Sequence, residues 1–125
     1  GYRVADPRIV HEVQKVRLPY HLSQITHAAA RAALRHADSQ MQQIELIRSE
    51  RSALAKWLEE QGFVVSPSSS NFLLFGPLAS RHEVWESLVA DGVLIREVGP
   101  EGYLRVTVGT QAENEVFKAA LKEAL

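Results

Sequence analysis

The sequence predicts an α+β fold in which a small, mostly antiparallel sheet carries helices on one face and is preceded by two or three helices. Two observations predict this arrangement. Apolar residues recur at helical spacing through most of residues 7–61, whereas residues 63–108 contain short apolar runs that glycine and proline separate. A chain of 125 residues is also long enough to bury a core without a disulfide or a metal.

The first helix is predicted over residues 7–16. Asp6 is suited to the N-cap and Pro7 to the first helical position, and the apolar residues that follow have helical spacing. Pro19 prevents the helix from continuing, because proline lacks the N–H that a helix interior needs.

Two further helices are predicted before the sheet. Ser23 caps an alanine-rich helix over residues 24–36, whose small side chains predict packing on several sides. A longer helix starts at Asp38 or Ser39 and ends at Gln61, with Gly62 as the residue that terminates it. Its expected apolar stripe consists of Met41, Ile44, Ile47, Leu54, Trp57 and Leu58.

Short apolar runs predict four strands in the rest of the chain. The first is residues 63–65. Residues 71–75 are almost continuously apolar, so this strand is expected to be covered on both faces. Residues 93–98 and 103–108 are expected to pair as an antiparallel hairpin through the loop 99–102.

Two helices accompany these strands, each with a predicted capping box. Ser80 and Glu83 open a helix that stops at Gly92. Thr110 and Glu113 open the last helix, which runs to the end of the sequence given.

Composition excludes several classes of function. The chain has no cysteine, which excludes a disulfide scaffold, an iron–sulfur cluster and a cysteine nucleophile. Its 14 basic and 15 acidic residues give a net charge of −1, without the basic footprint of a nucleic-acid-binding domain. No apolar run reaches the length of a membrane span, and no signal peptide is recognisable. We therefore expect a cytoplasmic protein that binds neither nucleic acid nor membrane.

The usual signatures of metal and nucleotide chemistry are missing from the sequence. No pair of histidines has the i, i+4 spacing of a helical metal site, so no metal is expected. Neither a phosphate-binding glycine loop nor a serine nucleophile motif is present. The histidines are His11, His21, His27, His36 and His82.

Two arginines on the predicted hairpin are the more informative candidates. Arg96 and Arg105 lie on adjacent strands, and strand alternation places Arg105 opposite the apolar face. Two guanidinium forks side by side would suit a ligand with two anionic groups, such as carboxylate and phosphate. The alternatives are that Arg96 pairs with Glu97 or Glu101 and that Arg105 is a solvated residue on the sheet surface.

Tyr20 and Asn71 are weaker candidates for ligand binding. Tyr20 precedes a helix start, where backbone N–H groups could face an anion. Asn71 begins the predicted strand 71–75, where its amide could bind a ligand or close the preceding serine-rich turn. From the residues alone, a structural role is favoured for both.

These segments together resemble one enzyme family. Residues 16–23 (VRLPYHLS), residues 70–75 (SNFLLF), and above all residues 92–98 (GVLIREV) with residues 103–110 (YLRVTVGT) carry the resemblance. The chain resembles the C-terminal part of the histidinol-phosphate aminotransferases, which are fold-type I pyridoxal-phosphate enzymes. The resemblance covers essentially the whole chain.

The resemblance implies an activity and roles for the candidate residues. The family transfers an amino group between glutamate and imidazole-acetol phosphate, which gives L-histidinol phosphate in histidine biosynthesis, and its enzymes are homodimers. Arg105 would hold the substrate α-carboxylate, and Arg96 would meet the substrate phosphate or the side-chain carboxylate of glutamate. Tyr20 and Asn71 match segments that come near the active site.

The family's catalytic lysine has no counterpart in this chain. In the family, the lysine that forms the Schiff base lies in a Ser-x-Lys-like motif that precedes the segment matched here. The resemblance therefore implies a fragment without a catalytic residue, in which residues 1–40 are tethering helices from the end of a large domain and residues 41–125 are the small α+β domain. Alone, it is expected to bind no pyridoxal phosphate and to be inactive.

Other functions stay open at this point. Related enzymes that transaminate aromatic amino acids or decarboxylate threonine phosphate have similar C-terminal domains. A stand-alone module that binds an anion or an amino acid, and a purely structural dimerisation piece, are alternatives from other classes.

Overall fold

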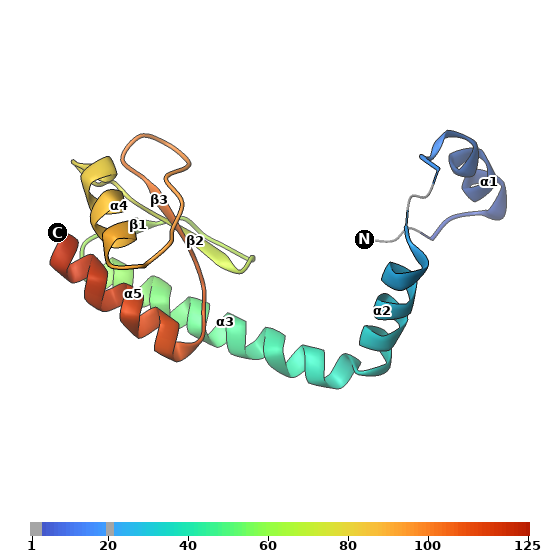
Figure 1. The fold of residues 1–125 in the computed structure, drawn as a ribbon, viewed down its shortest axis with the longest axis horizontal. Coiled ribbons are helices and arrows are strands. Elements are labelled where there is room, and N and C mark those ends of the chain that lie inside the picture. Colours follow the sequence, from blue (N-terminus) through green and yellow to red (C-terminus); the bar gives the residue numbers. More distant parts are fainter. Residues whose placement is uncertain (1–3, 20–21) are drawn as a thin grey trace. The chain divides into compact units, whose positions relative to one another are not determined.

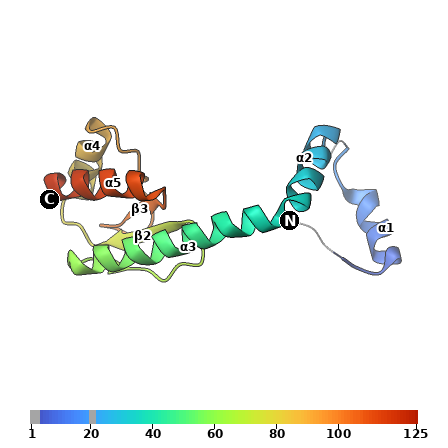
Figure 2. The ribbon, with the colours of Figure 1, turned by 90° about the horizontal axis from the view of Figure 1, so that it is seen from below.

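The computed structural model describes residues 4–19 and 22–125. The chain divides into two compact units, Gly1–Gln40 and Met41–Leu125. Eight elements follow one another along the described residues: three helices, two strands, a helix, a strand and a last helix (Figures 1 and 2).

The first unit contains α1 (Pro7–Val16), α2 (Gln24–Arg35) and the beginning of α3 (Ala37–Glu60). Both predicted caps are confirmed, since a side-chain oxygen of Asp6 accepts from the N–H of Arg8 at 2.9 Å and Ser23 Oγ accepts from the N–H of Thr26 at 3.1 Å. No residue of α1 or α2 is buried. The expectation that α2 packs on several sides is therefore wrong for this chain, because none of the described residues covers its alanine faces.

The second unit is built on a three-stranded antiparallel sheet in the order β1-β2-β3. The strands are β1 (Val64–Val65), β2 (Phe72–Gly76) and β3 (Leu104–Thr107). Val65 pairs with Phe75, and Leu74 pairs with Arg105. The antiparallel sheet of the predicted fold is confirmed.

The predicted strand 93–98 does not form. One isolated bridge joins Arg96 to Arg105, with N···O distances of 3.0 and 2.9 Å. Backbone groups on both sides of Arg96 form hydrogen bonds elsewhere and so do not pair with β3. The N–H of Val93 bonds to the carbonyl of Leu88 at 2.8 Å, and the N–H of Tyr103 bonds within the turn to the carbonyl of Pro100 at 3.1 Å.

Two helices follow the strands of this unit, α4 (Arg81–Ala90) and α5 (Gln111–Ala124). The capping box of α5 is confirmed, because Thr110 and Glu113 bond to each other's backbone N–H. The capping box of α4 is absent, and Ser80 makes no side-chain cap bond. With ψ of 58°, Ser80 lacks the extended conformation that turns an N-cap side chain toward the first helical N–H groups.

The core lies between one face of the sheet and the helices. Figures 1 and 2 show α3 and α5 side by side on one side of the strands, and α4 packs against α5. The aromatic rings of Phe63 and Phe117 meet Phe75 edge to face, at centroid distances of 5.4 and 6.0 Å. The core residues are Leu54, Leu58, Leu73, Phe75, Leu78, Val84, Leu88, Leu104, Val106, Val108, Phe117, Ala120 and Leu121.

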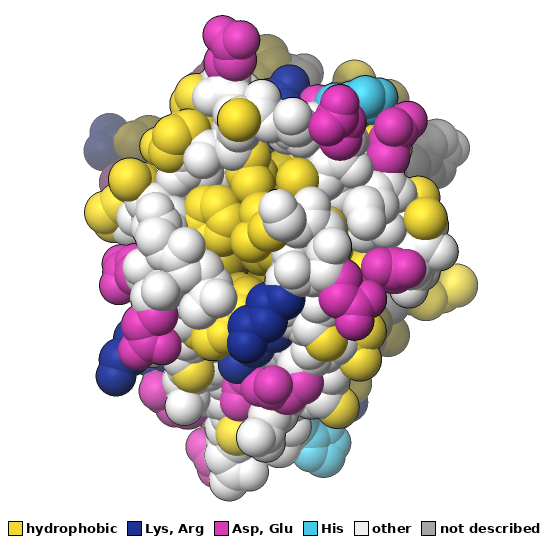
Figure 3. Space-filling view, turned by 90° about the vertical axis from the view of Figure 1, so that its left-hand side faces the viewer, with side chains coloured by type: hydrophobic (Ala, Val, Ile, Leu, Met, Phe, Trp, Pro, Cys, Tyr) yellow, Lys and Arg dark blue, Asp and Glu magenta, His cyan; other side chains and the backbone are white. Residues whose placement is uncertain are grey.

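Partly buried side chains continue this core toward the surface. Trp57 and Trp85 pack against it from α3 and α4. Figure 3 shows the side of the second unit near α4 and α5, where hydrophobic side chains gather at the centre and charged side chains surround them.

Two expectations about burial are corrected. β2 is not covered on both faces: Phe75 is fully buried, but Phe72 on the opposite face is 36% exposed. The apolar stripe of α3 is buried only in its C-terminal half, at Leu54 and Leu58. The sheet reaches only the second half of the helix, so the earlier members of the stripe remain exposed. These are Met41, Ile44 and Ile47.

Asn114 is the one buried polar residue in the part of the chain that the structure describes. Its Oδ1 accepts from the N–H of Gly109 at 3.0 Å, while Nδ2 donates to Glu50 Oε2 at 2.8 Å and to the carbonyl of Gly109 at 3.2 Å. These bonds tie α5 both to α3 and to the turn that follows β3. Asn114 therefore fixes the C-terminal end of the strand that carries Arg105.

Replacing Asn114 by alanine is expected to lower the free energy of unfolding by about 2 kcal/mol, because its partly buried partners Glu50 and Gly109 lose their hydrogen bonds. Urea unfolding of the chain measures this change. Glu123→Ala is the matched control, since Glu123 is exposed on the same helix, and its effect should stay within about 0.5 kcal/mol. Equal effects of the two substitutions would contradict the role of Asn114.

Candidate functional site

Arg96 and Arg105 lie directly opposite each other. Each donates its backbone N–H to the other's carbonyl, so they form a hydrogen-bonded antiparallel pair. Residues opposite each other in such a pair project their side chains to the same face. The predicted juxtaposition of the two arginines therefore occurs, although through one bridge rather than a full hairpin. Two like charges directly opposite each other repel. An anion bound between them would offset this repulsion.

The Arg105 guanidinium is fixed by an aromatic ring and has no acidic partner. Its Cζ lies 4.6 Å from the centroid of the Phe72 ring, on the sheet face opposite the core. Arg105 Nε is buried and has no hydrogen-bond partner among the described residues. A buried donor without a partner costs about 1–3 kcal/mol, which an anion bound at this point would recover. Arg105 is thus not the fully solvated surface residue of the alternative interpretation.

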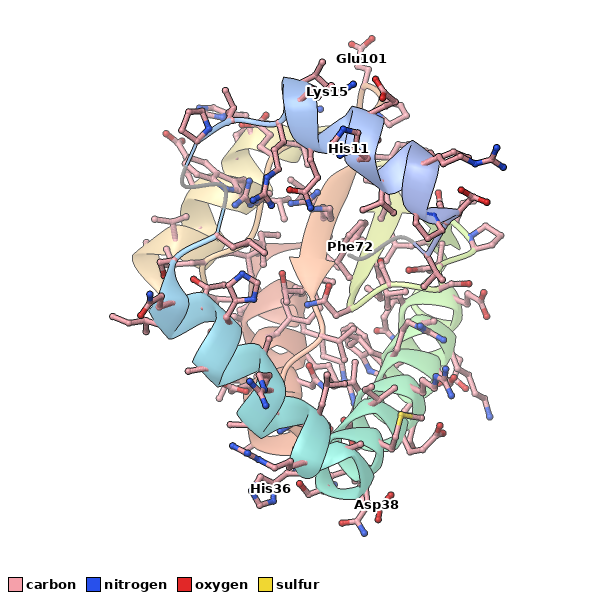
Figure 4. All side chains as sticks on the ribbon, turned by 90° about the vertical axis from the view of Figure 1, so that its right-hand side faces the viewer. His11, Lys15, His36, Asp38, Phe72 and Glu101 are labelled. Carbon is pink, nitrogen blue, oxygen red and sulfur yellow. The ribbon has the colours of Figure 1, made fainter. Side chains whose placement is uncertain are left out.

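The acidic residues that could have neutralised Arg96 are placed elsewhere. Glu97 accepts from Arg81 Nε at 2.9 Å and lies 3.0 Å from His82 Nδ1. Glu101 lies exposed on the loop that follows, and its side chain points outward (Figure 4). Within residues 4–19 and 22–125, neither Arg96 nor Arg105 forms an ion pair.

Glu97 and His82 shift each other's pKa. The hydrogen bond to Glu97, aided by the charge of Glu86, raises the pKa of His82 above its ordinary 6.5. The hydrogen bonds from His82 and from Arg81 in turn hold the pKa of Glu97 below its ordinary 4.5. Each group thus favours the charged form of the other.

Asn71, a further predicted site residue, lies just before β2 and lines a hollow that includes neither arginine of the pair. The backbone carbonyl of Asn71 accepts from the N–H of Val108 at 2.8 Å, which supports the structural interpretation. Its side chain is exposed at a hollow of about 210 Å³ beside Arg48 and Arg51 of α3. Tyr20 lies outside the described residues.

The lysines of this chain do not fit a site that holds pyridoxal phosphate covalently. Lys15 is paired with Glu12 at 2.6 Å on α1, and Lys118 is paired with Glu115 at 2.8 Å on α5. Lys122 lies 5.8 Å from the Trp57 ring centroid on the helix surface, and Lys56 is exposed. A Schiff-base lysine needs a desolvated pocket, whereas these four lysines lie on helix surfaces, where they are paired or exposed.

Histidines and acidic residues do not gather into a metal site in the part of the chain that is described. Figure 4 shows His11 on α1 and His36 after α2 at opposite ends of the first unit. In the same described ranges, no helix combines the length and the apolarity that crossing a membrane requires.

Sequence reasoning missed Phe72 as the support of Arg105 and missed Arg81 and His82 as the partners of Glu97. Phe72 could have been found, because alternation places it on the same face as Leu74, the residue opposite Arg105. The partners of Glu97 are 15 and 16 residues away in sequence and share no local pattern with it.

Comparison with known proteins places the chain among aminotransferases. The family model described as aminotransferase class I and II matches residues 1–121. The histidinol-phosphate aminotransferase of Thermobifida fusca is 50% identical over 99% of this chain, and histidinol-phosphate aminotransferase 3 of Burkholderia lata is 48% identical over all of it. In both cases the chain spans 34% of the relative's length.

Two solved structures share the fold. A histidinol-phosphate aminotransferase from Sinorhizobium meliloti, in complex with pyridoxal-5'-phosphate, aligns with a TM-score of 0.77 and 26% identity. The alignment covers 94% of this chain and 34% of that one. A putative aminotransferase from Burkholderia pseudomallei aligns with a TM-score of 0.84 at 19% identity, over 94% of this chain and 38% of that one.

The raised pKa of His82 makes a prediction about stability. Its stabilising contribution is fully present below about pH 6.5, the ordinary value, and is lost as pH rises through the higher value of the folded state. We expect the unfolding free energy of the wild type to fall more between about pH 6 and about pH 8 than that of His82→Gln. Denaturant titrations across this range measure it, with Glu86→Gln retaining most of the dependence. Parallel pH profiles for wild type and His82→Gln would contradict the assignment.

Proposed function

We propose that this chain, which belongs to the aminotransferase class I and II family, is the C-terminal part of a pyridoxal-phosphate-dependent histidinol-phosphate aminotransferase. The observation that carries the proposal is the identity of about half its residues with enzymes of that name along its whole length. The reaction would convert glutamate and imidazole-acetol phosphate to 2-oxoglutarate and L-histidinol phosphate. Because the chain spans a third of these relatives, the activity is proposed for the longer protein.

The contribution proposed for this chain is recognition of the substrate's anionic groups. Arg105 would bind the α-carboxylate, since its fork matches a carboxylate in two hydrogen bonds and its buried Nε lacks a partner. The Phe72 ring beneath the guanidinium would restrict its rotation, so that little conformational entropy is lost on binding. Arg96 would meet the second anionic group, either the phosphate or the side-chain carboxylate of glutamate.

Both half-reactions can share these two arginines. Glutamate carries two carboxylates, and histidinol phosphate carries a phosphate, so each substrate offers at least one group to a guanidinium fork. Since the structure describes Arg96 as exposed and Arg105 as half-buried, Arg105 is the more rigid of the two. We infer that Arg105 orients the substrate, while Arg96 tolerates anions of different size.

The cofactor would be held by the remaining two thirds of the longer protein. None of the lysines here fits the role, so no catalytic residue is assigned to this chain. We propose that residues 1–40 are tethering helices from the end of a large domain, and that residues 41–125 form the small domain. We also propose that the longer protein is a cytoplasmic homodimer, on the basis of the family resemblance alone.

Arg105→Ala in the full-length protein is expected to lower kcat/KM for glutamate by about a hundredfold, because a half-buried charge pair with its α-carboxylate is lost. Steady-state kinetics measure this loss. Arg8→Ala is the control, since the Arg8 side chain is 92% exposed on α1, and it should leave kcat/KM unchanged. A loss under about threefold for Arg105→Ala would refute its role.

Substrate preference separates the related enzymes. The full-length protein is expected to turn over histidinol phosphate with a kcat/KM at least about a hundredfold above that for phenylalanine. Transamination of phenylalanine at a comparable rate would favour the aromatic branch. Release of carbon dioxide from threonine phosphate would favour the decarboxylase.

The 125-residue chain alone is expected to bind no stoichiometric pyridoxal phosphate, because its lysines are exposed or paired. Absorption spectroscopy after incubation with the cofactor and dialysis measures this. Retention of one equivalent of cofactor would show that the cofactor site lies within this chain. It would overturn the proposal that the rest of the longer protein holds the cofactor.

A further inference from the structure

Arg96 lacks the strand ladder that normally fixes a residue in a sheet. One bridge joins it to Arg105, and residues 97–100 beyond it form no further pairs with β3. A guanidinium on such a segment would lose much conformational freedom on binding an anion. Something other than the sheet must therefore hold this segment if Arg96 is to bind well.

The first turns of α4 hold it at three points. Arg81 Nε donates to Glu97 at 2.9 Å, and Arg81 Nη1 donates to the carbonyl of Pro100 at 3.2 Å. His82 Nδ1 lies 3.0 Å from the other oxygen of Glu97. Trp85 Nε1 donates to the carbonyl of Ile95 at 3.0 Å. These four bonds bracket Arg96 on both sides along the chain.

Glu97 is the centre of this clamp. Its side chain is 24% exposed, and both of its oxygens are bonded to α4. The His82 ring also stacks on the Trp85 ring at 5.8 Å and 16°, which restricts the imidazole. Both side-chain partners of Glu97 thus come from α4, a helix whose Val84 and Leu88 belong to the core.

The clamp also keeps the charge of Glu97 away from Arg96. In extended backbone, successive side chains point to opposite sides, so Glu97 faces α4 while Arg96 faces the side of Arg105. The charged groups around the clamp are Arg81, Glu83 and Glu86 of α4 and Glu101 of the loop. Glu97 therefore bonds to α4 and does not compete with an anionic ligand for Arg96.

We propose that Glu97, clamped by Arg81 and His82, is a positioning residue that holds Arg96 beside Arg105 for anion binding. This proposal rests on the proposed function, since it assigns Arg96 to the phosphate of histidinol phosphate or to the side-chain carboxylate of glutamate. Glu97 itself does not touch the substrate.

The test uses the full-length protein and a double-mutant cycle. Glu97→Ala is expected to raise KM for histidinol phosphate about tenfold, with kcat within about twofold, because the misplaced Arg96 weakens binding rather than chemistry. In an Arg96→Ala background, the same substitution should add less than about twofold. Glu97→Gln, which keeps the size of the side chain and one bond to Arg81, should give an intermediate KM. Glu101→Gln is the control from the same loop and should leave KM unchanged.

The outcomes are distinguishable. If Glu97→Ala raises KM by the same factor with and without Arg96, it acts independently of Arg96, and the positioning role is wrong while the proposed function stands. If Arg96→Ala leaves KM for both histidinol phosphate and glutamate unchanged, both the role of Arg96 and its positioning by Glu97 fail. Should Glu97→Ala not fold, the cycle with Glu97→Gln decides in the same way, because additive effects of Glu97→Gln and Arg96→Ala on KM would overturn the proposal.

Discussion

The alternation of side chains along β3 is the constraint on which the candidate site depends. Leu104 and Val106 are 0% and 4% exposed in the core, so the residue between them must face the other side of the sheet. A shift of register by one residue would bury the Arg105 guanidinium and expose both apolar side chains. The same packing that stabilises the unit therefore presents Arg105 on the open face, above the ring of Phe72.

Local patterns were sufficient to predict most elements. The caps at Asp6, Ser23 and Thr110 form as expected, because each involves residues two or three positions apart. The orientation of Arg105 was also predictable, since strand alternation needs no knowledge of distant partners. Family resemblance added the proposed roles of the two arginines, whereas the residues alone left open that Arg105 is solvated and that Arg96 is ion-paired.

What the sequence could not predict depends on distant contacts. Residues 93–98 have the composition of a strand, but bonds to α4 and to their own turn leave a single bridge. Glu97 was a candidate partner for the adjacent Arg96, whereas Arg81 and His82 bind it from another element. Periodicity also predicts that the apolar faces of α1 and α2 are buried, but it does not indicate which residues would cover them. In the described residues, no side chain of either helix is buried.

The absence of an acidic partner for Arg96 and Arg105 in the described residues has a consequence for how the proposed anionic ligand would arrive. Two uncompensated cations on one sheet face create a local positive potential in a chain whose net charge is −1. Such a field attracts small anions before any contact forms and accelerates their encounter. Dissolved salt screens it over about 8 Å at physiological ionic strength, so the encounter rate will depend on the ionic medium. If the two arginines bind anions as proposed, inorganic phosphate and sulfate would compete with the substrate, and buffer composition would affect the measured affinity.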